Sequence, residues 1–63
     1  MNLLENYIQD GYKIEPVIPS PVKGVNYIKF TGKADCYGNV REETHIWSVE
    51  EWKQIKKQGY YLG

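Results

Sequence analysis

Hydrophobic and polar positions follow two different periods along this chain. Alternation with period two runs through the middle and is typical of half-buried strands, whereas spacings of three and four residues toward both ends are typical of amphipathic helices. The predicted elements, in chain order, are a helix over 2–10, strands over 12–18, 25–36 and 40–47, a helix over 48–58 and a candidate closing strand over 60–62.

The helix predicted over 48–58 carries signals at both of its ends. Ser48 and Glu51 have the spacing of a capping box. Trp47 and Trp52 occupy the two positions of a hydrophobic staple. Gly59 stands where a left-handed residue ends a helix, so both boundaries follow from local sequence.

The helix predicted over 2–10 is shorter. Its apolar side chains recur at helical spacing, and Gly11 is placed to cap its end. A helix this short is marginal in water, so we expect it to dock on the sheet. In the strand that follows, Pro16 favours an edge position, and residues 19–24 form a stiff connector whose proline isomers the sequence leaves open.

The strands over 25–36 and 40–47 predict a hairpin with the three-residue loop Tyr37-Gly38-Asn39, in which Asn39 takes the left-handed position. A two-residue loop is rejected because we expect it to set Asp35 against Glu42, a like-charge pair. The predicted cross-strand pairs are Cys36–Val40, Asp35–Arg41, Lys33–Glu43, Thr31–His45, Lys29–Trp47 and, on the other face, Phe30–Ile46.

This register gives the hairpin two different faces. One is apolar, with Ile28, Phe30 and Ile46, and is expected to lie under one or both helices. The chain is therefore predicted to be a single small α+β domain over 1–63, ordered helix, strand, β-hairpin, helix, with a three- to four-stranded antiparallel sheet. The second face is predicted to be free for a partner and carries Tyr27, Lys29, Thr31, Lys33, Arg41, Glu43, His45 and Trp47.

Size and composition narrow the classes of function. The chain has 63 residues, eight basic and eight acidic side chains and a formal net charge of zero. No apolar run approaches the roughly 20 residues of a membrane-spanning helix, and residues 1–5 lack the basic start of a secretory signal. One cysteine cannot form an internal disulfide, which suits the cytoplasm.

A domain this small is marginally stable alone, so the 14% aromatic content or a second subunit must add stability.

The chain shows no arrangement of residues typical of catalysis. His45 is the single histidine, and its expected neighbours are Thr31 and Glu43, neither of which makes it a general base. Cys36 has Asp35 beside it, which disfavours a reactive thiolate. There is no glycine-rich phosphate loop and no metal-ligand spacing, so we expect no enzyme activity, no cofactor and no metal site.

Nucleic-acid binding is an alternative function. Residues 23–30 are similar to the RNP1 pattern of RNA-recognition motifs, with Tyr27 and Phe30 at aromatic positions and Val25 departing from a third. The resemblance implies base stacking, although the helix expected after that strand is replaced by a hairpin. Residues 19–30 also resemble the wing of small phage excisionases, whose preceding recognition helix is missing. Interleaved charges give little counterion release, which weakens this alternative.

Protein binding is the preferred function. Tyrosine, tryptophan and arginine dominate interaction hot spots, and the free hairpin face contains all three. In its short, neutral and aromatic format the chain resembles the small inhibitors made by phages and mobile elements, such as anti-CRISPR proteins, which implies a host defence protein as partner. A homodimer stays open. A third alternative, suggested by the six tyrosines, is an oligomer that sequesters a nucleotide between subunits.

Overall fold

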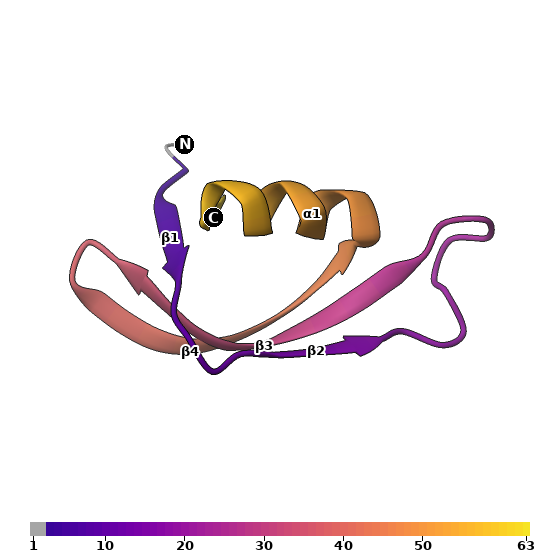
Figure 1. The fold of residues 1–63 in the computed structure, drawn as a ribbon, viewed down its shortest axis with the longest axis horizontal. Helices are drawn as coiled ribbons and strands as arrows, with labels where there is room; N and C mark the ends of the chain where they lie inside the picture. Colours follow the sequence, from indigo (N-terminus) through magenta and orange to yellow (C-terminus); the bar gives the residue numbers. More distant parts are fainter. Residues whose placement is uncertain (1–2) are drawn as a thin grey trace.

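The computed structural model describes residues 3–63 as a curled antiparallel sheet with one helix lying in its concave side (Figure 1). Strands make up 51% of these residues and the helix 16%. The predicted α+β domain, ordered helix, strand, hairpin and helix with a three- to four-stranded sheet, is therefore wrong: the described residues form a five-stranded sheet and one helix. The elements are β1 (Glu5–Ile8), β2 (Lys13–Pro16), β3 (Tyr27–Cys36), β4 (Asn39–Ser48), α1 (Val49–Gln58) and β5 (Tyr60–Leu62).

Strand β1 lies in the middle of the helix predicted over 2–10, and none of the described residues 3–10 is helical; Asn2 lies outside the described residues. The strand pairs with β3 on one side and β5 on the other, with Ile8 opposite Ala34 and Asn6 opposite Tyr61. A short isolated helix has little stability of its own. Pairing with two strands that are distant in the sequence stabilises these residues as a strand more than local interactions stabilise them as a helix.

Strands β1 and β2 lie along the same edge of β3. Ile8 is opposite Ala34 and Lys13 is opposite Thr31, so residues 9–12 of one strand face residues 32–33 of the other. This bulge contains Gly11, which turns the chain between two strands instead of capping a helix. The extra residues bend the edge, as bulges do, and β1 is directed toward β5. The edge position predicted for the strand with Pro16 is confirmed, since β2 pairs with β3 alone among the described strands.

The β3–β4 hairpin has a two-residue loop, Tyr37-Gly38, with Cys36 opposite Asn39. The predicted three-residue loop is wrong. Tyr37 and Gly38 have φ of 52° and 87°, the pair of left-handed residues that a type I′ turn requires. The Asp35 carboxylate accepts a hydrogen bond of 2.8 Å from the Gly38 N–H and holds the turn.

The shorter loop shifts every cross-strand pair of the hairpin by one residue. Such a shift turns the side chains of one strand to the opposite face of the sheet. The expected clash of Asp35 with Glu42 does not arise, because Asp35 lies opposite Val40. The observed pairs include Ile28–Trp47, Lys29–Ile46, Phe30–His45, Lys33–Glu42 and Ala34–Arg41.

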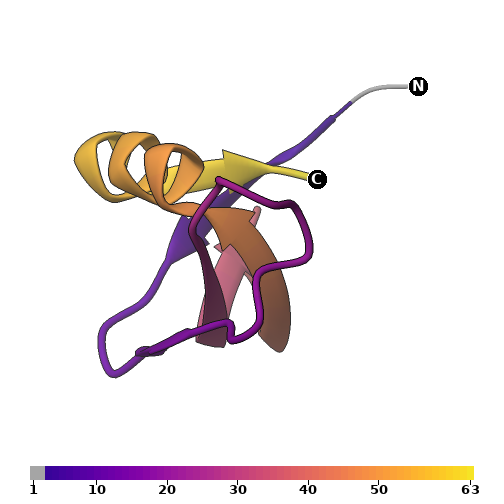
Figure 2. The same cartoon turned by 90° about the vertical axis from the view of Figure 1, so that its right-hand side faces the viewer.

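We call the side of the sheet toward α1 the inner face and the opposite side the outer face. The inner face carries the core: Phe30 is fully buried, and Ile28, Ala34, Trp52, Ile55 and Tyr61 are buried with it. Ile46, predicted for this core, is instead 55% exposed on the outer face. Figure 2 shows α1 and β5 lying together above the strands of the hairpin.

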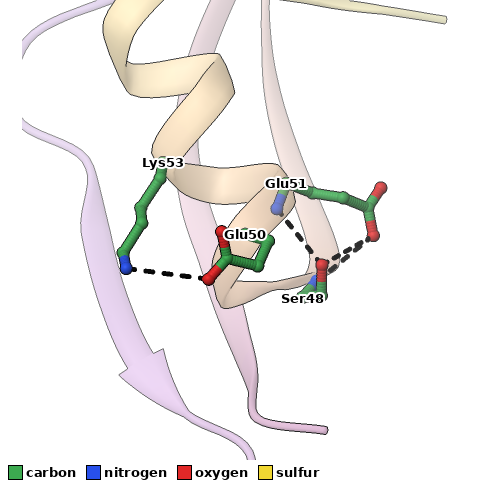
Figure 3. A network of polar contacts seen from close by, with 4 residues as sticks. All are labelled: Ser48, Glu50, Glu51 and Lys53. Carbon is green, nitrogen blue, oxygen red and sulfur yellow. Dashed lines mark hydrogen bonds and ion pairs between the residues drawn. The ribbon is translucent and has the colours of Figure 1, made fainter.

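Helix α1 begins and ends as predicted. The Glu51 N–H donates to Ser48 Oγ at 3.2 Å and the Ser48 N–H donates to Glu51 Oε1 at 3.3 Å, which completes the capping box (Figure 3). Trp47 and Trp52 stack with ring centroids 6.0 Å apart. Gly59 has φ of 91°, and its N–H donates to the Ile55 carbonyl at 2.7 Å. Beyond the sheet, the connector contains a cis bond between Ile18 and Pro19.

Candidate protein-binding surface

The residues predicted to form one binding face lie on both faces of the sheet. Those on β3 are on the outer face, opposite β4 residues with even numbers. Those on β4 pair with Ile28, Phe30, Gly32 and Ala34 and therefore belong to the inner face. The outer set is Tyr27, Lys29, Thr31 and Lys33, and the inner set is Arg41, Glu43, His45 and Trp47.

His45 and Trp47 are part of the internal packing. Their rings stack at 5.0 Å with an interplanar angle of 7°, and Trp47 also contacts Phe30. His45 Nε2 shares a hydrogen bond of 3.0 Å with the buried Tyr61 hydroxyl. These contacts make both half-buried side chains part of the packing of the domain.

Tyr61 has a perturbed titration that follows from this position. Burial raises the pKa of its hydroxyl above 10.0, and the nearby Glu43 and Cys36 raise it further, while Arg41 lowers it. The neutral phenol is the form that packs against His45. This inner group therefore stabilises the fold with its hydroxyl protonated.

The residues predicted for a nucleic-acid face are divided between the two faces of the sheet. Tyr27 lies on the outer face and Phe30 on the inner face, where it is fully buried and cannot stack on a base. On the outer face Lys29 lies opposite Glu15 and Lys33 opposite Glu42, so positive and negative side chains alternate. Arg41, the remaining predicted cation, is on the inner side.

Two tyrosines pack together at the hairpin-loop end of the outer face, and a third lies near them. Tyr7 on β1 lies directly opposite Tyr60 on β5, with ring centroids 5.4 Å apart. Tyr37, in the hairpin loop, is 76% exposed and close enough to contribute to the raised pKa of Tyr7. We call these three residues the tyrosine cluster. Sequence analysis missed it, because the rings come from three distant segments and only the excess of tyrosine signalled them.

The tyrosine cluster is accessible and polar at its rim. Tyr7 is 47% exposed, and its hydroxyl donates to Glu5 Oε2 at 3.3 Å. The Glu5 carboxylate is the main cause of the raised pKa of Tyr7. Val40 and Leu62 are also exposed large apolar side chains of the adjoining strands β4 and β5. Tyrosine combines a large apolar ring with a hydrogen-bonding tip at low entropic cost, which makes such clusters good contact surfaces.

The free edge of β4 is a second notable surface. Among the described strands β4 pairs with β3 alone, along all ten of its residues. A fully exposed edge offers unpaired backbone donors and acceptors to another chain. Val40 and Ile46, both about half exposed, are side chains of this edge.

Three hollows among the described residues can be compared with ordinary ligand pockets. The most apolar lies between α1 and the β1–β2 bulge and has a volume of about 150 Å³, below the usual ~300–1,000 Å³ of ligand pockets. Two wider hollows, of about 430 and 440 Å³, are open. Within residues 3–63, no three His, Cys, Asp or Glu side chains are grouped so that they could hold a metal ion.

Two findings bear on the class of protein. Across the described part of the chain, no helix has the length and apolar character needed to cross a membrane. Comparison with known proteins finds that no family model, no curated protein and no solved structure matches this chain.

Proposed function

We propose that this chain is a small non-enzymatic binding protein that acts by protein–protein contact through the tyrosine cluster. The observation that carries the proposal is the convergence of Tyr7, Tyr37 and Tyr60 on one accessible end of the outer face. Tyrosine is among the residues enriched in the centres of protein interfaces. An open sheet surface that exposes several rings suits a protein partner better than a small molecule.

The charges around the cluster favour a protein partner over a nucleic acid. Glu5 and Asp35 adjoin Tyr7, the first by a hydrogen bond and the second by strand pairing. These carboxylates would repel a phosphate backbone, whose binding depends on basic side chains. A partner with a basic or polar rim around an apolar centre fits this end of the sheet.

The biological context we propose is inhibition. A small phage or mobile-element protein that covers a surface of a host defence protein, as anti-CRISPR proteins do, needs only a stable fold and one contact surface. The cytoplasm is the proposed compartment, since the one cysteine is unpaired and half-buried. This function uses no cofactor, because occupying a surface requires no chemistry.

A capture experiment from bacterial lysate tests the proposal. The immobilised chain is compared with a Tyr7→Thr/Tyr37→Asn double variant, which removes two exposed rings and keeps residues suited to a strand and a type I′ turn. We expect the wild type to retain a specific protein and the double variant to lose most of it. Nuclease treatment of the lysate should leave the captured protein unchanged.

A matched control is Tyr27→Thr, which removes a tyrosine from the same face at its other end. Tyr27 and Asp35 are eight positions apart on β3, about 27 Å along a strand. This control should bind like the wild type. Loss of binding with Tyr27→Thr but not with the double variant would move the contact surface away from the cluster and refute the proposal.

A further inference from the structure

We propose that two copies of this chain associate through the free edges of β4 (Asn39–Ser48), in antiparallel pairing with Thr44 on the two-fold axis. The inference goes beyond the proposed function, because it concerns a different surface from the tyrosine cluster. It rests on the state of the sheet edges, the direction of the backbone groups and the order of charges along β4.

The edges of the sheet differ in how they are protected. Strand β2 is four residues long and ends in Pro16, and β5 has three residues. Short strands and prolines are devices that prevent edge pairing. Strand β4 has ten residues, contains no proline and pairs with β3 without a bulge from Cys36–Asn39 to Tyr27–Ser48. It is the one described edge long and regular enough to receive a strand.

The backbone groups of β4 alternate in direction. A residue next to a two-residue hairpin loop forms a bonded pair, and bonded and non-bonded pairs then alternate along the ladder. The odd-numbered residues of β4 therefore bond to β3. The Val49 N–H, which donates to the Asn26 carbonyl at 3.0 Å, continues the same odd-numbered series.

The even-numbered residues of β4 consequently turn their N–H and C=O groups to the free edge. Ser48 confirms this direction, since its N–H leaves the ladder and donates to the Glu51 carboxylate. That capping bond closes the edge at its helix end. The backbone groups still open to a partner strand belong to Val40, Glu42, Thr44 and Ile46.

Charge and the number of open backbone groups together select one register for a symmetric pair. Each bonded pair joins an even-numbered residue of one copy to an even-numbered residue of the other. The midpoint of such a pair is always a residue, so the two-fold axis passes through a residue of β4 and never between two residues. An axis at Glu42 or at Glu43 sets two identical carboxylates opposite each other, which is destabilising. An axis at Arg41 or at His45 similarly opposes two basic side chains.

An axis at Ile46 sets no like charges opposite each other but has to pair Thr44 with Ser48, whose N–H is already bonded to Glu51. An axis at Val40 runs into the hairpin loop.

An axis at Thr44 avoids every like-charge pair. Thr44 lies opposite Thr44 of the other copy, Glu43 opposite His45, and Arg41 opposite Trp47, each of the last two occurring twice by symmetry. The bonded pairs are 44–44 and both 42–46 pairs, with about six backbone hydrogen bonds in all. The two sheets become one continuous sheet with the β4 strands at its centre. Each half of this sheet carries one tyrosine cluster, so the dimer could bind two partner molecules.

Sedimentation of the intact chain tests the association. We expect a mass near twice 7.4 kDa at high concentration. Thr44→Pro removes an edge N–H without touching the β3–β4 ladder and should weaken the dimer by roughly tenfold or more. Thr44→Val, which keeps the N–H and suits a strand, should sediment like the wild type. A wild-type chain that stays monomeric at every concentration overturns the proposal.

Cysteine cross-linking tests the register. In a Cys36→Ala background, Thr44→Cys should form a disulfide-linked dimer on oxidation, because bonded antiparallel pairs have Cα atoms about 5.5 Å apart. Glu42→Cys is the matched control, since the two copies of residue 42 would lie about 14 Å apart, four residues along the strand and one strand spacing across it. Cross-linking through Glu42→Cys but not Thr44→Cys, or a dimer in which neither cross-links, refutes pairing about Thr44.

Discussion

Gly32 and Tyr12 touch at the centre of the curled sheet. A Cβ added to Gly32 would lie 2.6 Å from the Cβ of Tyr12 and 3.0 Å from its Cα. The contact exists because the β1–β2 bulge carries Tyr12 over the inner face of β3, where its ring packs against Phe30 and Trp52. The absence of a side chain at position 32 lets the backbone cross there.

Gly32→Ala should therefore destabilise the domain. The added methyl group meets backbone as well as side-chain atoms of Tyr12, so relaxation must move the bulge, and we expect a loss of about 1–3 kcal/mol in the free energy of unfolding. Chemical denaturation measures it. Thr31→Ala, which changes the neighbouring residue on the outer face, should cost less than about 1 kcal/mol. Equal effects of the two changes would contradict the crowding at Gly32.

Tyr37→Asn should stabilise the domain. Tyr37 has φ of 52°, a left-handed conformation that asparagine adopts more easily, and Asn-Gly is the preferred type I′ pair. We expect a gain of about 0.5–1 kcal/mol in thermal or denaturant unfolding. Tyr37→Phe keeps the strained conformation and should leave stability nearly unchanged. A destabilised Tyr37→Asn variant would show that the ring holds the loop.

Ser48→Ala should weaken helix α1. It removes the oxygen that accepts from the Glu51 N–H, and loss of such a cap costs about 0.5–2 kcal/mol. Lys53→Ala is the control in the same region (Figure 3), because it removes only the exposed ion pair with Glu50, 3.7 Å long. That pair should contribute less than about 1 kcal/mol. The ranking is wrong if denaturation shows Lys53→Ala to be the more damaging change.

Tyr61→Phe should reduce the sensitivity of the domain to alkali. Burial raises the pKa of Tyr61 in the folded state above 10.0, so above that pH the unfolded chain loses the proton first. The contribution of this group is complete below about pH 10 and is lost as the pH rises through the folded pKa. Denaturation at several pH values should show a shallower alkaline decline for Tyr61→Phe. Parallel declines would mean that Tyr61 titrates as it does in the unfolded chain.

The parts of the fold that sequence predicted correctly are those fixed by neighbours along the chain. Ser48, Glu51 and Gly59 bound α1 through contacts within a few residues. The strands of the hairpin follow from alternation. The first strand could not be predicted in this way, because Ile8 and its neighbours are held by Ala34 on β3 and by β5, far along the chain.

The register of the hairpin was mispredicted for one local reason. Tyr37-Gly38 forms a turn usually marked by Asn-Gly, and the two-residue loop was rejected for a clash of Asp35 with Glu42 that its register does not produce, since Asp35 lies opposite Val40. One residue of register then moved His45 and Trp47 inward and Ile46 outward. The tyrosine cluster depends on that register and on the β1–β5 pairing, neither of which is encoded locally.

The β1–β5 pairing also affects the order in which the strands can fold. Leu4 and Gly63 exchange backbone hydrogen bonds of 3.0 Å in both directions, so the first described strand is joined to the last. Joining segments this distant is entropically costly and slows folding. During synthesis on the ribosome, β1 can pair with β3 first, but its other side stays unpaired until residues 60–62 emerge.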